Sequence, residues 1–471
     1  MTVPTDSTGT EPTSAQPAAA GSTATETPSS GSEAHLRRVL GVPSLVLFGL
    51  VYMVPLTVFT TYGIVTQMTG GRLPTAYIVT LVAMVFTARS YGLMARAFPF
   101  AGSAYTYTQR SFGPGIGFLA GWALMLDYLF LPMINYLVIG IYLHAAFPVI
   151  PPWVFILVTI ILVTLLNILG IVSVARANAL IITVQAIFIV VFIALSVSTI
   201  TQHTDVDLLT PFVGTGDSGG FGTIFAGAAV LSLSFLGFDS VSTLAEEARE
   251  PKKSVPKAIM WTTISAGLLF VLLAYVSLLV VPTHTFKDVD SAALGVMTTA
   301  GGQFLVAFFT AAYVAGAAGS ALASQASVSR ILYAMGRDGV LPTGFFGRIS
   351  KRYGTPVLAV LAVSVVSLLA LVIDLTLLAE MISFGALIAF SAVNLSVIKH
   401  FFMEQKLRHG AHLFTYLIVP AIGFALTLWL WTSLSPRTLI VGLIWLAVGF
   451  VYLLWLTRGF RRTTPMLDLK E

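Results

Sequence analysis

The sequence predicts an all-α membrane protein with twelve transmembrane helices. Of its 471 residues, 56% are hydrophobic and only 10% are charged, whereas about 25% are charged in an average soluble domain. The mean hydropathy is +0.90. Apolar runs such as 181–198 and 439–456 match the roughly 20 residues that cross about 30 Å of hydrocarbon. These observations exclude a water-soluble globular protein.

Two tails are expected to flank one membrane domain. Residues 1–34 are rich in Ser, Thr, Pro, Ala and Gly and contain no Lys or Arg, so we expect a disordered cytoplasmic tail there. The transmembrane domain is expected over 35–460, and a second cytoplasmic tail over 461–471. The chain contains no cysteine, which excludes disulfides and thiolate metal sites. No cofactor and no metal site are expected.

Twelve apolar segments follow one another between clusters of Gly, Pro and charged residues. We expect spans at approximately 40–66, 73–95, 115–144, 152–172, 177–200, 221–246, 257–282, 302–333, 356–373, 376–399, 413–433 and 438–457. Since the number of spans is even, both termini lie on the same side of the membrane.

The basic residues indicate which side that is. If the termini are cytoplasmic, 22 of the 25 Lys and Arg residues lie inside, and only Arg72, Lys287 and Arg437 lie outside. The positive-inside rule therefore predicts cytoplasmic N and C termini for a multi-pass protein of the plasma (inner) membrane. Because the basic residues are scattered between apolar segments, no nucleic-acid partner is expected.

Two of the segments contain residues that interrupt a helix. Pro55 lies inside the first segment, where its ring and missing N–H free backbone groups of the preceding turn. The sixth segment contains Gly237 among small polar residues at 232–240. Irregular backbone at membrane depth is tolerated only where it is packed in protein or lines a wet cavity.

The positions of the two breaks predict an inverted repeat. They lie in the first and sixth segments, and because five is odd, the second block of five helices enters the membrane upside down. We expect repeat one at about 40–200, repeat two at about 221–399, and two extra helices at about 413–457. One interrupted helix in each repeat is typical of a secondary transporter with its substrate site near the middle of the membrane.

Two carboxylates are expected at membrane depth, where insertion costs about 2.5–3.5 kcal/mol. Asp239 follows the break in the sixth segment and is either a substrate-facing or gating acid or a helix cap. Asp127 lies among apolar and aromatic residues of the third segment and serves either binding or structure. Glu380, near the outer end of the tenth segment, is expected at the membrane interface.

Several uncharged residues near these positions have two open interpretations. Phe235 and Phe238 either line the site, where aromatic rings stack on ammonium groups, or pack between helices. Asn135 and Tyr313 are polar groups within spans that are also explained by hydrogen bonds to a neighbouring helix.

Three stretches resemble a known family of transporters. The run Ser-Phe-Leu-Gly-Phe-Asp-Ser-Val-Ser-Thr-Leu-Ala-Glu-Glu-Ala-Arg-Glu-Pro at 234–251, followed by Val-Pro-Lys-Ala-Ile at 255–259, is similar to the sixth-helix signature of the amino acid–polyamine–organocation transporters. Residues 101–107 with 126–135, and 326–330 with 335–338, resemble the bacterial putrescine importers of that family. The similarity covers nearly all of 36–460.

The resemblance implies a leucine-transporter-like fold of two inverted five-helix repeats plus two helices, working as a proton-coupled importer. The substrate would lie between helices one, three, six, eight and ten. Amino acid transporters of this kind resemble one another in a glycine-rich break in helix one that binds the substrate carboxylate. Here the break, Tyr52–Thr57, contains no glycine, which fits a substrate without a carboxylate, such as a diamine.

The chain also departs from the expected pattern at three places. Thr60 stands where putrescine importers have an acid, and Gln325 stands where they have a histidine. Helix five contains no lysine, whereas some amino acid transporters have a proton-sensitive one there, so the resemblance assigns no coupling group.

Together these inferences predict a proton-coupled importer of putrescine or a related small amine, which is not an enzyme. Asp127 and Asp239 would attract the ammonium groups, and two phenylalanines would cover the alkyl chain. The predicted substrate-binding residues are Tyr52, Thr57, Asp127, Ser234, Phe235, Gly237, Phe238 and Asp239. An amino acid permease is the alternative. An intramembrane aspartyl protease is disfavoured, because such enzymes resemble one another in a Gly-x-Gly-Asp motif and this chain has Leu-Gly-Phe-Asp at 236–239.

Overall fold

The computed structural model describes residues 40–99, 103–170, 174–202, 207–214, 220–337 and 339–461. The tail expected at 1–34 and nearly all of the tail expected at 461–471 lie outside these ranges.

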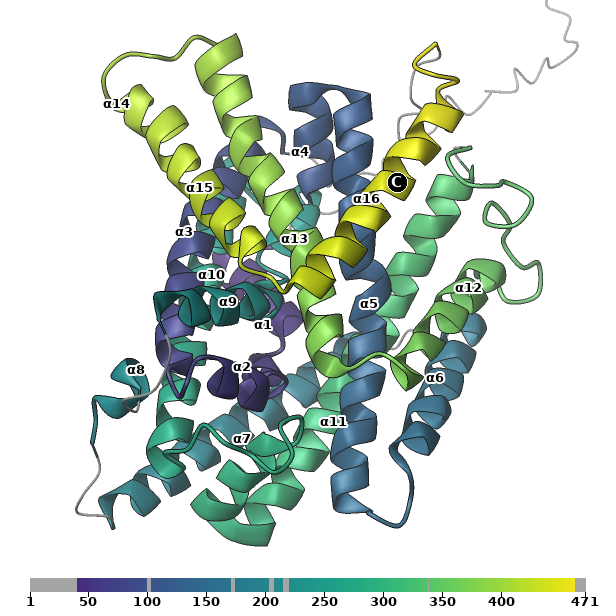
Figure 1. The fold of residues 1–471 in the computed structure, drawn as a ribbon. Helices are drawn as coiled ribbons and strands as arrows, with labels where there is room; N and C mark the ends of the chain where they lie inside the picture. Colours follow the sequence, from purple (N-terminus) through teal and green to yellow (C-terminus); the bar gives the residue numbers. More distant parts are fainter. Residues whose placement is uncertain are drawn as a thin grey trace, which may run out of the picture. The chain divides into compact units, whose positions relative to one another are not determined.

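The described residues form helices joined by loops and short connections (Figure 1). In chain order these are α1 (Val42–Met53), η1 (Pro55–Phe59), α2 (Tyr62–Met68), α3 (Leu73–Ala97), α4 (Ser103–Phe112), α5 (Pro114–Ala146), α6 (Pro152–Leu169), α7 (Val174–Thr201), α8 (Thr210–Val213), α9 (Phe221–Leu231), η2 (Ser232–Phe235), η3 (Asp239–Glu247), α10 (Pro251–Val280), α11 (Ala292–Arg337), α12 (Val357–Ser367), η4 (Leu368–Leu371), α13 (Leu375–Val397), η5 (Ile398–Glu404), α14 (Ala411–Leu413), η6 (Phe414–Ile418), α15 (Val419–Thr432) and α16 (Pro436–Leu456). Within these ranges β-pairing is limited to an isolated bridge between Leu40 and Ala248.

The all-α membrane fold is confirmed. In the described part of the chain, eleven helical segments are long and apolar enough to cross a membrane. The remaining predicted span corresponds to the shorter apolar helix Val357–Leu371. It is followed closely by α13, whose N-cap Asp374 accepts a hydrogen bond from the Leu377 N–H at 2.7 Å. The twelve-span arrangement is consistent with these helices.

The predicted start of the eighth span coincides with a break in α11. The eighth span was expected to begin at about residue 302, and within α11 (Ala292–Arg337) Gly301 (φ −152°) and Gly302 (φ +61°) are non-helical. A separate helical stretch from Ala292 therefore precedes the span, and the sequence analysis did not predict that stretch.

Both predicted helix breaks are present. In the first, α1 ends at Met53, Val54 has φ +49°, and the chain continues as the 3₁₀ helix η1 from Pro55. In the second, α9 passes into the 3₁₀ helix η2, after which Leu236 is extended and Gly237 has φ +124°. Both spans are therefore interrupted where the sequence contains Pro or Gly.

The helices pack in two groups. In the α3 group, α3 and α10 pack extensively together and also contact α9 and α1 respectively. In the α5 group, α5 and α11 pack against each other and against α6 and α12. Helix α13 contacts both α5 and α3, and Figure 1 shows it beside α5. The broken helices thus belong to the first group, whereas α5 and α11 belong to the second.

Candidate functional site

The two helix breaks lie directly against each other. A Cβ atom at Gly237 would be 2.7 Å from Cδ1 of Tyr52 and 3.1 Å from the backbone nitrogen of Met53. The φ of +124° at Gly237 is also one that residues with a side chain rarely adopt. Glycine is therefore required here for two reasons, and its absence of a side chain allows the sixth span to approach the first.

A small central cavity of about 50 Å³ is bounded by both breaks and by α5 and α11. It is lined by Tyr52, Met53, Val54, Thr57, Thr60, Leu131, Ile134, Asn135, Val138, Leu233, Leu236, Tyr313, Ala317 and Ser320. No carboxylate and no basic side chain is among these lining residues. The central cavity is lined by uncharged side chains, both apolar ones and ones with hydroxyl or amide groups.

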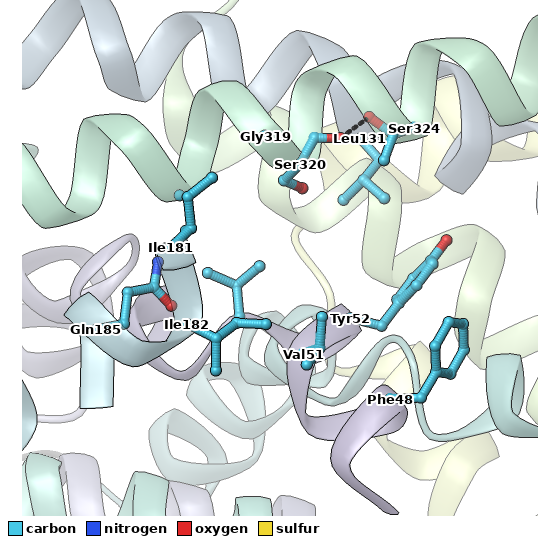
Figure 2. A pocket seen from close by; sticks show the side chains of 13 residues that line it. Phe48, Val51, Tyr52, Leu131, Ile181, Ile182, Gln185, Gly319, Ser320 and Ser324 are labelled. Atoms are coloured by element: carbon cyan, nitrogen blue, oxygen red, sulfur yellow. Dashed lines mark hydrogen bonds between the residues drawn. The ribbon is translucent and has the colours of Figure 1, made fainter. Parts of the chain in front are cut away.

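A larger inner cavity of about 250 Å³ adjoins the central one on the side of α1. Its walls come from α1, α5, α7 and α11, and Figure 2 shows the side chains that face it. The two cavities share four lining residues, Tyr52, Val54, Leu131 and Ser320. They therefore form adjacent parts of one space between the two helix groups.

Aromatic side chains cover the central cavity on the other side, toward α2. The hydroxyls of Thr60 and Tyr313 are hydrogen-bonded to each other, and Tyr142 donates to the carbonyl of Phe59 at 2.8 Å. The ring of Phe59 packs against that of Phe309 at 5.3 Å, and the ring of Tyr142 against that of Tyr313 at 4.8 Å. The space is thus larger toward α1 and is covered by packed rings toward α2.

Asp127 and Asp239 both lie close to Tyr52, behind the cavity wall. Asp127 is only 7% exposed, and its Oδ1 has no hydrogen-bond partner. Asp239 accepts hydrogen bonds from the Ser103 hydroxyl at 3.0 Å and the Gly237 N–H at 3.3 Å. Both carboxyl groups lie within electrostatic range of Tyr52, which lines both cavities. Among the described residues, neither forms an ion pair with a Lys or Arg.

Three predicted site residues of the sixth span are placed away from both cavities. Phe235 packs edge-to-face on Phe270 of α10 at 5.5 Å, and Phe238 packs against Tyr91 at 5.4 Å. The hydroxyl of Ser234 is 3.1 Å from that of Tyr77. These side chains hold the broken helix against the α3 group.

Leu233 and Leu236 line the central cavity instead and were not among the predicted site residues. Leu233 lies in η2, and the N–H of Leu236, directly after η2, donates to the Leu233 carbonyl at 3.1 Å, so this 3₁₀-type turn places residues three apart on the same face. A three-residue period applied to 232–236 would have separated these two leucines from Phe235.

Of the remaining predicted residues, Tyr52 and Thr57 line the central cavity. The Thr57 hydroxyl is engaged with the carbonyls of Val54 at 2.6 Å and Met53 at 3.0 Å, so it also satisfies backbone groups at the break. Asn135 lines the cavity and donates to Ser320 at 3.1 Å. Asn135 and Tyr313 therefore each line the cavity and also form a hydrogen bond to a neighbouring helix.

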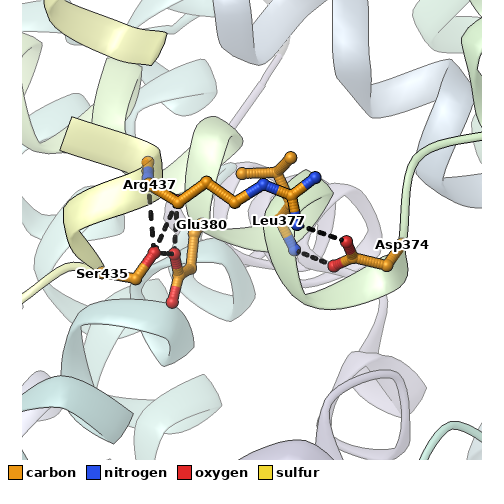
Figure 3. Close-up of polar contacts among 6 residues, drawn as sticks. Asp374, Leu377, Glu380, Ser435 and Arg437 are labelled. Carbon is orange, nitrogen blue, oxygen red and sulfur yellow. Dashed lines mark hydrogen bonds and ion pairs between the residues drawn. The ribbon is translucent and has the colours of Figure 1, made fainter. Parts of the chain in front are cut away.

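Glu380, which was expected at the membrane interface, is buried near the beginnings of α13 and α16. It is 3% exposed and lies between α13 and α16 (Figure 3). Its Oε2 accepts hydrogen bonds from the hydroxyls of Ser435 and Thr438 at the beginning of α16. A carboxylate at a helix N-terminus is favourably placed. Glu380 thus fastens α16 to α13 and does not line either cavity.

We expect Glu380→Ala to destabilise the protein without changing its affinity for the substrate. The change leaves the buried Thr438 hydroxyl without its acceptor and removes one acceptor of the half-buried Ser435 hydroxyl, and an unsatisfied buried group costs about 1–3 kcal/mol. The midpoint of thermal unfolding in detergent should fall, while the dissociation constant for the transported substrate stays unchanged. An increased dissociation constant at an unchanged melting temperature would place Glu380 in the substrate site.

Gln325 also lies apart from the cavities, within the α5 group. Its Oε1 accepts from the Tyr136 hydroxyl and from Asn167 Nδ2, both at 3.1 Å, and its Nε2 donates to Ser364 Oγ at 2.7 Å. Gln325 is fully buried. Its side chain therefore connects α5, α6, α11 and α12 through hydrogen bonds. No group of three or more His, Asp or Glu side chains in the described ranges is arranged to hold a metal ion.

Comparisons with known proteins agree with this architecture. Residues 44–461 match the profile of the family described as amino acid permease. The chain is 39% identical over 447 residues to the low-affinity putrescine importer PlaP of Escherichia coli (strain K12), covering 93% of this chain and 97% of the relative. It is 28% identical over 442 residues to the branched-chain amino acid permease BcaP of Bacillus subtilis (strain 168), covering 89% and 93% respectively. It is 27% identical over 441 residues to the methylthioribose transporter of the same organism, covering 89% and 94%.

Proposed function

The chain belongs to the amino acid permease family and is a multi-pass membrane transporter, and from that premise we propose that it imports putrescine or a related small amine. Import would be driven by the proton gradient across the plasma (inner) membrane, with both termini in the cytoplasm. The partners of the protein would then be a small amine, protons and membrane lipid.

The observation that carries the proposal is the buried carboxylate of Asp127. A charged carboxylate is rarely retained at membrane depth without a partner. Asp127 has one unpartnered oxygen and lies within electrostatic range of a cavity wall, together with Asp239. An ammonium group in the cavity would supply the opposite charge, and the low local dielectric would strengthen their attraction.

The cavity lining supports an amine rather than an amino acid. The first break contains no glycine over 52–57, so its N–H groups are less accessible to a carboxylate. The central cavity is lined by no basic side chain. Leu131, Val138 and Leu236 line it, and in the proposal they cover the alkyl chain. Phe235 and Phe238 support the broken helix from behind.

Alternating access would be a relative movement of the two helix groups. Tyr313, Thr60 and the rings around them close the central cavity toward α2, and the inner cavity extends toward α1. With cytoplasmic termini, this arrangement is a state closed to the outside. Opening would separate Thr60 of the first span from Tyr313 of α11.

Uptake into proteoliposomes tests this function. With purified protein and an inward proton gradient, we expect saturable uptake of labelled putrescine. Unlabelled diamines should inhibit this uptake, and neutral amino acids should not. Collapsing the gradient with a protonophore should reduce the initial rate. Saturable amino acid uptake that diamines do not inhibit would support the alternative, an amino acid permease.

An intramembrane protease is not supported. Asp127 and Asp239 share no hydrogen bond in the described part of the chain, whereas a catalytic pair of aspartates shares a proton. The relatives reported above are named as transporters.

A further inference from the structure

The wall of the inner cavity contains a buried amide with an unused acceptor. Gln185 of α7 is 2% exposed and lines the cavity. Its Oε1 is buried and has no hydrogen-bond partner. A buried carbonyl oxygen without a partner costs free energy that a donor from a ligand would recover.

Gln185 is held in place by its contact with α11. A Cβ atom at Gly316 would lie 2.0 Å from Gln185 Nε2, so the amide nitrogen packs directly on the glycine backbone of α11. This close contact depends on the lack of a side chain at residue 316. Figure 2 shows Gln185 on one side of the cavity, with Ser320, Ser324 and Tyr52 on the other sides.

The other polar groups of the inner cavity favour a ligand that donates hydrogen bonds. The Ser324 hydroxyl already donates to the carbonyl of Ser320 at 2.7 Å. The Ser320 hydroxyl oxygen accepts from Asn135 Nδ2 at 3.1 Å. No Lys, Arg or His is among the residues lining the cavity. A carboxylate would therefore find few donors here, whereas an ammonium group would find acceptors.

We propose that Gln185 Oε1 accepts a hydrogen bond from an ammonium group of the transported amine, which makes the inner cavity a second substrate subsite. The substrate reaches this subsite from the central cavity, because Tyr52, Val54, Leu131 and Ser320 border both spaces. Gln185 thus contributes to specificity from α7, a helix that lines no part of the central cavity. The inference rests on the proposed function, since it requires an amine substrate.

The test is equilibrium binding of labelled putrescine to the purified full-length protein, by scintillation proximity. Gln185→Met keeps a flexible side chain of similar length but removes the acceptor. A hydrogen bond to a charged group contributes enough that its loss should weaken binding about ten-fold or more. Gln202→Met, the same exchange at an exposed position directly after α7 that lines neither cavity, is the matched control and should bind like the wild type.

A gain-of-charge variant keeps the test decisive if Gln185→Met folds poorly. Gln185→Glu places a carboxylate at the same position, so putrescine binding should tighten as the pH rises and the carboxylate ionises. Wild-type affinity with a wild-type pH profile in Gln185→Glu, or wild-type affinity in Gln185→Met, would overturn the subsite. If the wild type itself binds no putrescine, the proposed function fails instead, so the two failures are distinguishable.

Discussion

Asp127→Asn is expected to weaken amine binding about ten-fold or more while leaving the protein at least as stable as the wild type. The substitution removes a buried carboxyl group near Tyr52, and with it the group that, in the proposal, is ionised beside the ammonium and attracts it across a medium of low dielectric. The same carboxyl group has an unpartnered oxygen, so its removal relieves a desolvation penalty in the empty protein. Putrescine binding and thermal unfolding, measured on the same preparation, check both effects.

Asp374→Asn is the matched control for this prediction. Asp374 is an exposed carboxylate that pairs with Arg437 at 3.0 Å and caps α13, and Asn caps a helix about as well as Asp. Putrescine affinity should be unchanged in this variant. Unchanged affinity in Asp127→Asn as well would remove Asp127 from the site.

Gln325→Leu is expected to destabilise the protein by about 3 kcal/mol. The change leaves the Tyr136 hydroxyl without its hydrogen-bond acceptor, and such a buried group costs about 1–3 kcal/mol. It also removes one hydrogen bond each from the Asn167 amide and the Ser364 hydroxyl, which keep other partners. Part of this penalty is offset by the added apolar side chain. The midpoint of thermal unfolding in detergent should fall clearly.

Two further measurements show whether Gln325 acts through the α5 group alone. Gln303→Leu, at an exposed position of the same helix, should leave the melting temperature nearly unchanged. The folded fraction of Gln325→Leu should bind putrescine with wild-type affinity, because Gln325 lines neither cavity. A wild-type melting temperature in Gln325→Leu would show that the network contributes little.

The twelve spans and the two breaks were predictable because they depend on local chemistry. A run of about 20 apolar residues has few alternatives to crossing a membrane. Pro55 and Gly237 alter the backbone wherever they occur. Because the breaks are five helices apart, an odd number, their opposite orientation is then predicted without any knowledge of packing.

It was harder to predict which side chains point into the cavity, because this depends on the type of helix and on contacts with distant parts of the chain. Phe235 and Phe238 were expected at the site because they flank the break, but the 3₁₀ turn directs Leu233 and Leu236 to the cavity. Gln185 is surrounded by apolar residues in the sequence, and its proposed contact with the substrate depends on its packing against a glycine in α11.

The hydrogen-bond partners of two buried polar residues could not be predicted from the sequence either. Glu380 finds its hydroxyl donors in α16, and Gln325 finds its partners in α5, α6 and α12. A polar residue in an apolar run signals that a partner exists. The identity of that partner becomes visible only when the helices are assembled.

A structure determined with bound putrescine tests the central claim most directly. We predict the diamine in the space between the two breaks and α11, with one ammonium group beside Tyr52 on the side of Asp127 and Asp239. Putrescine bound outside this space, or continuous helices where Val54 and Gly237 now interrupt the first and sixth spans, would contradict the account.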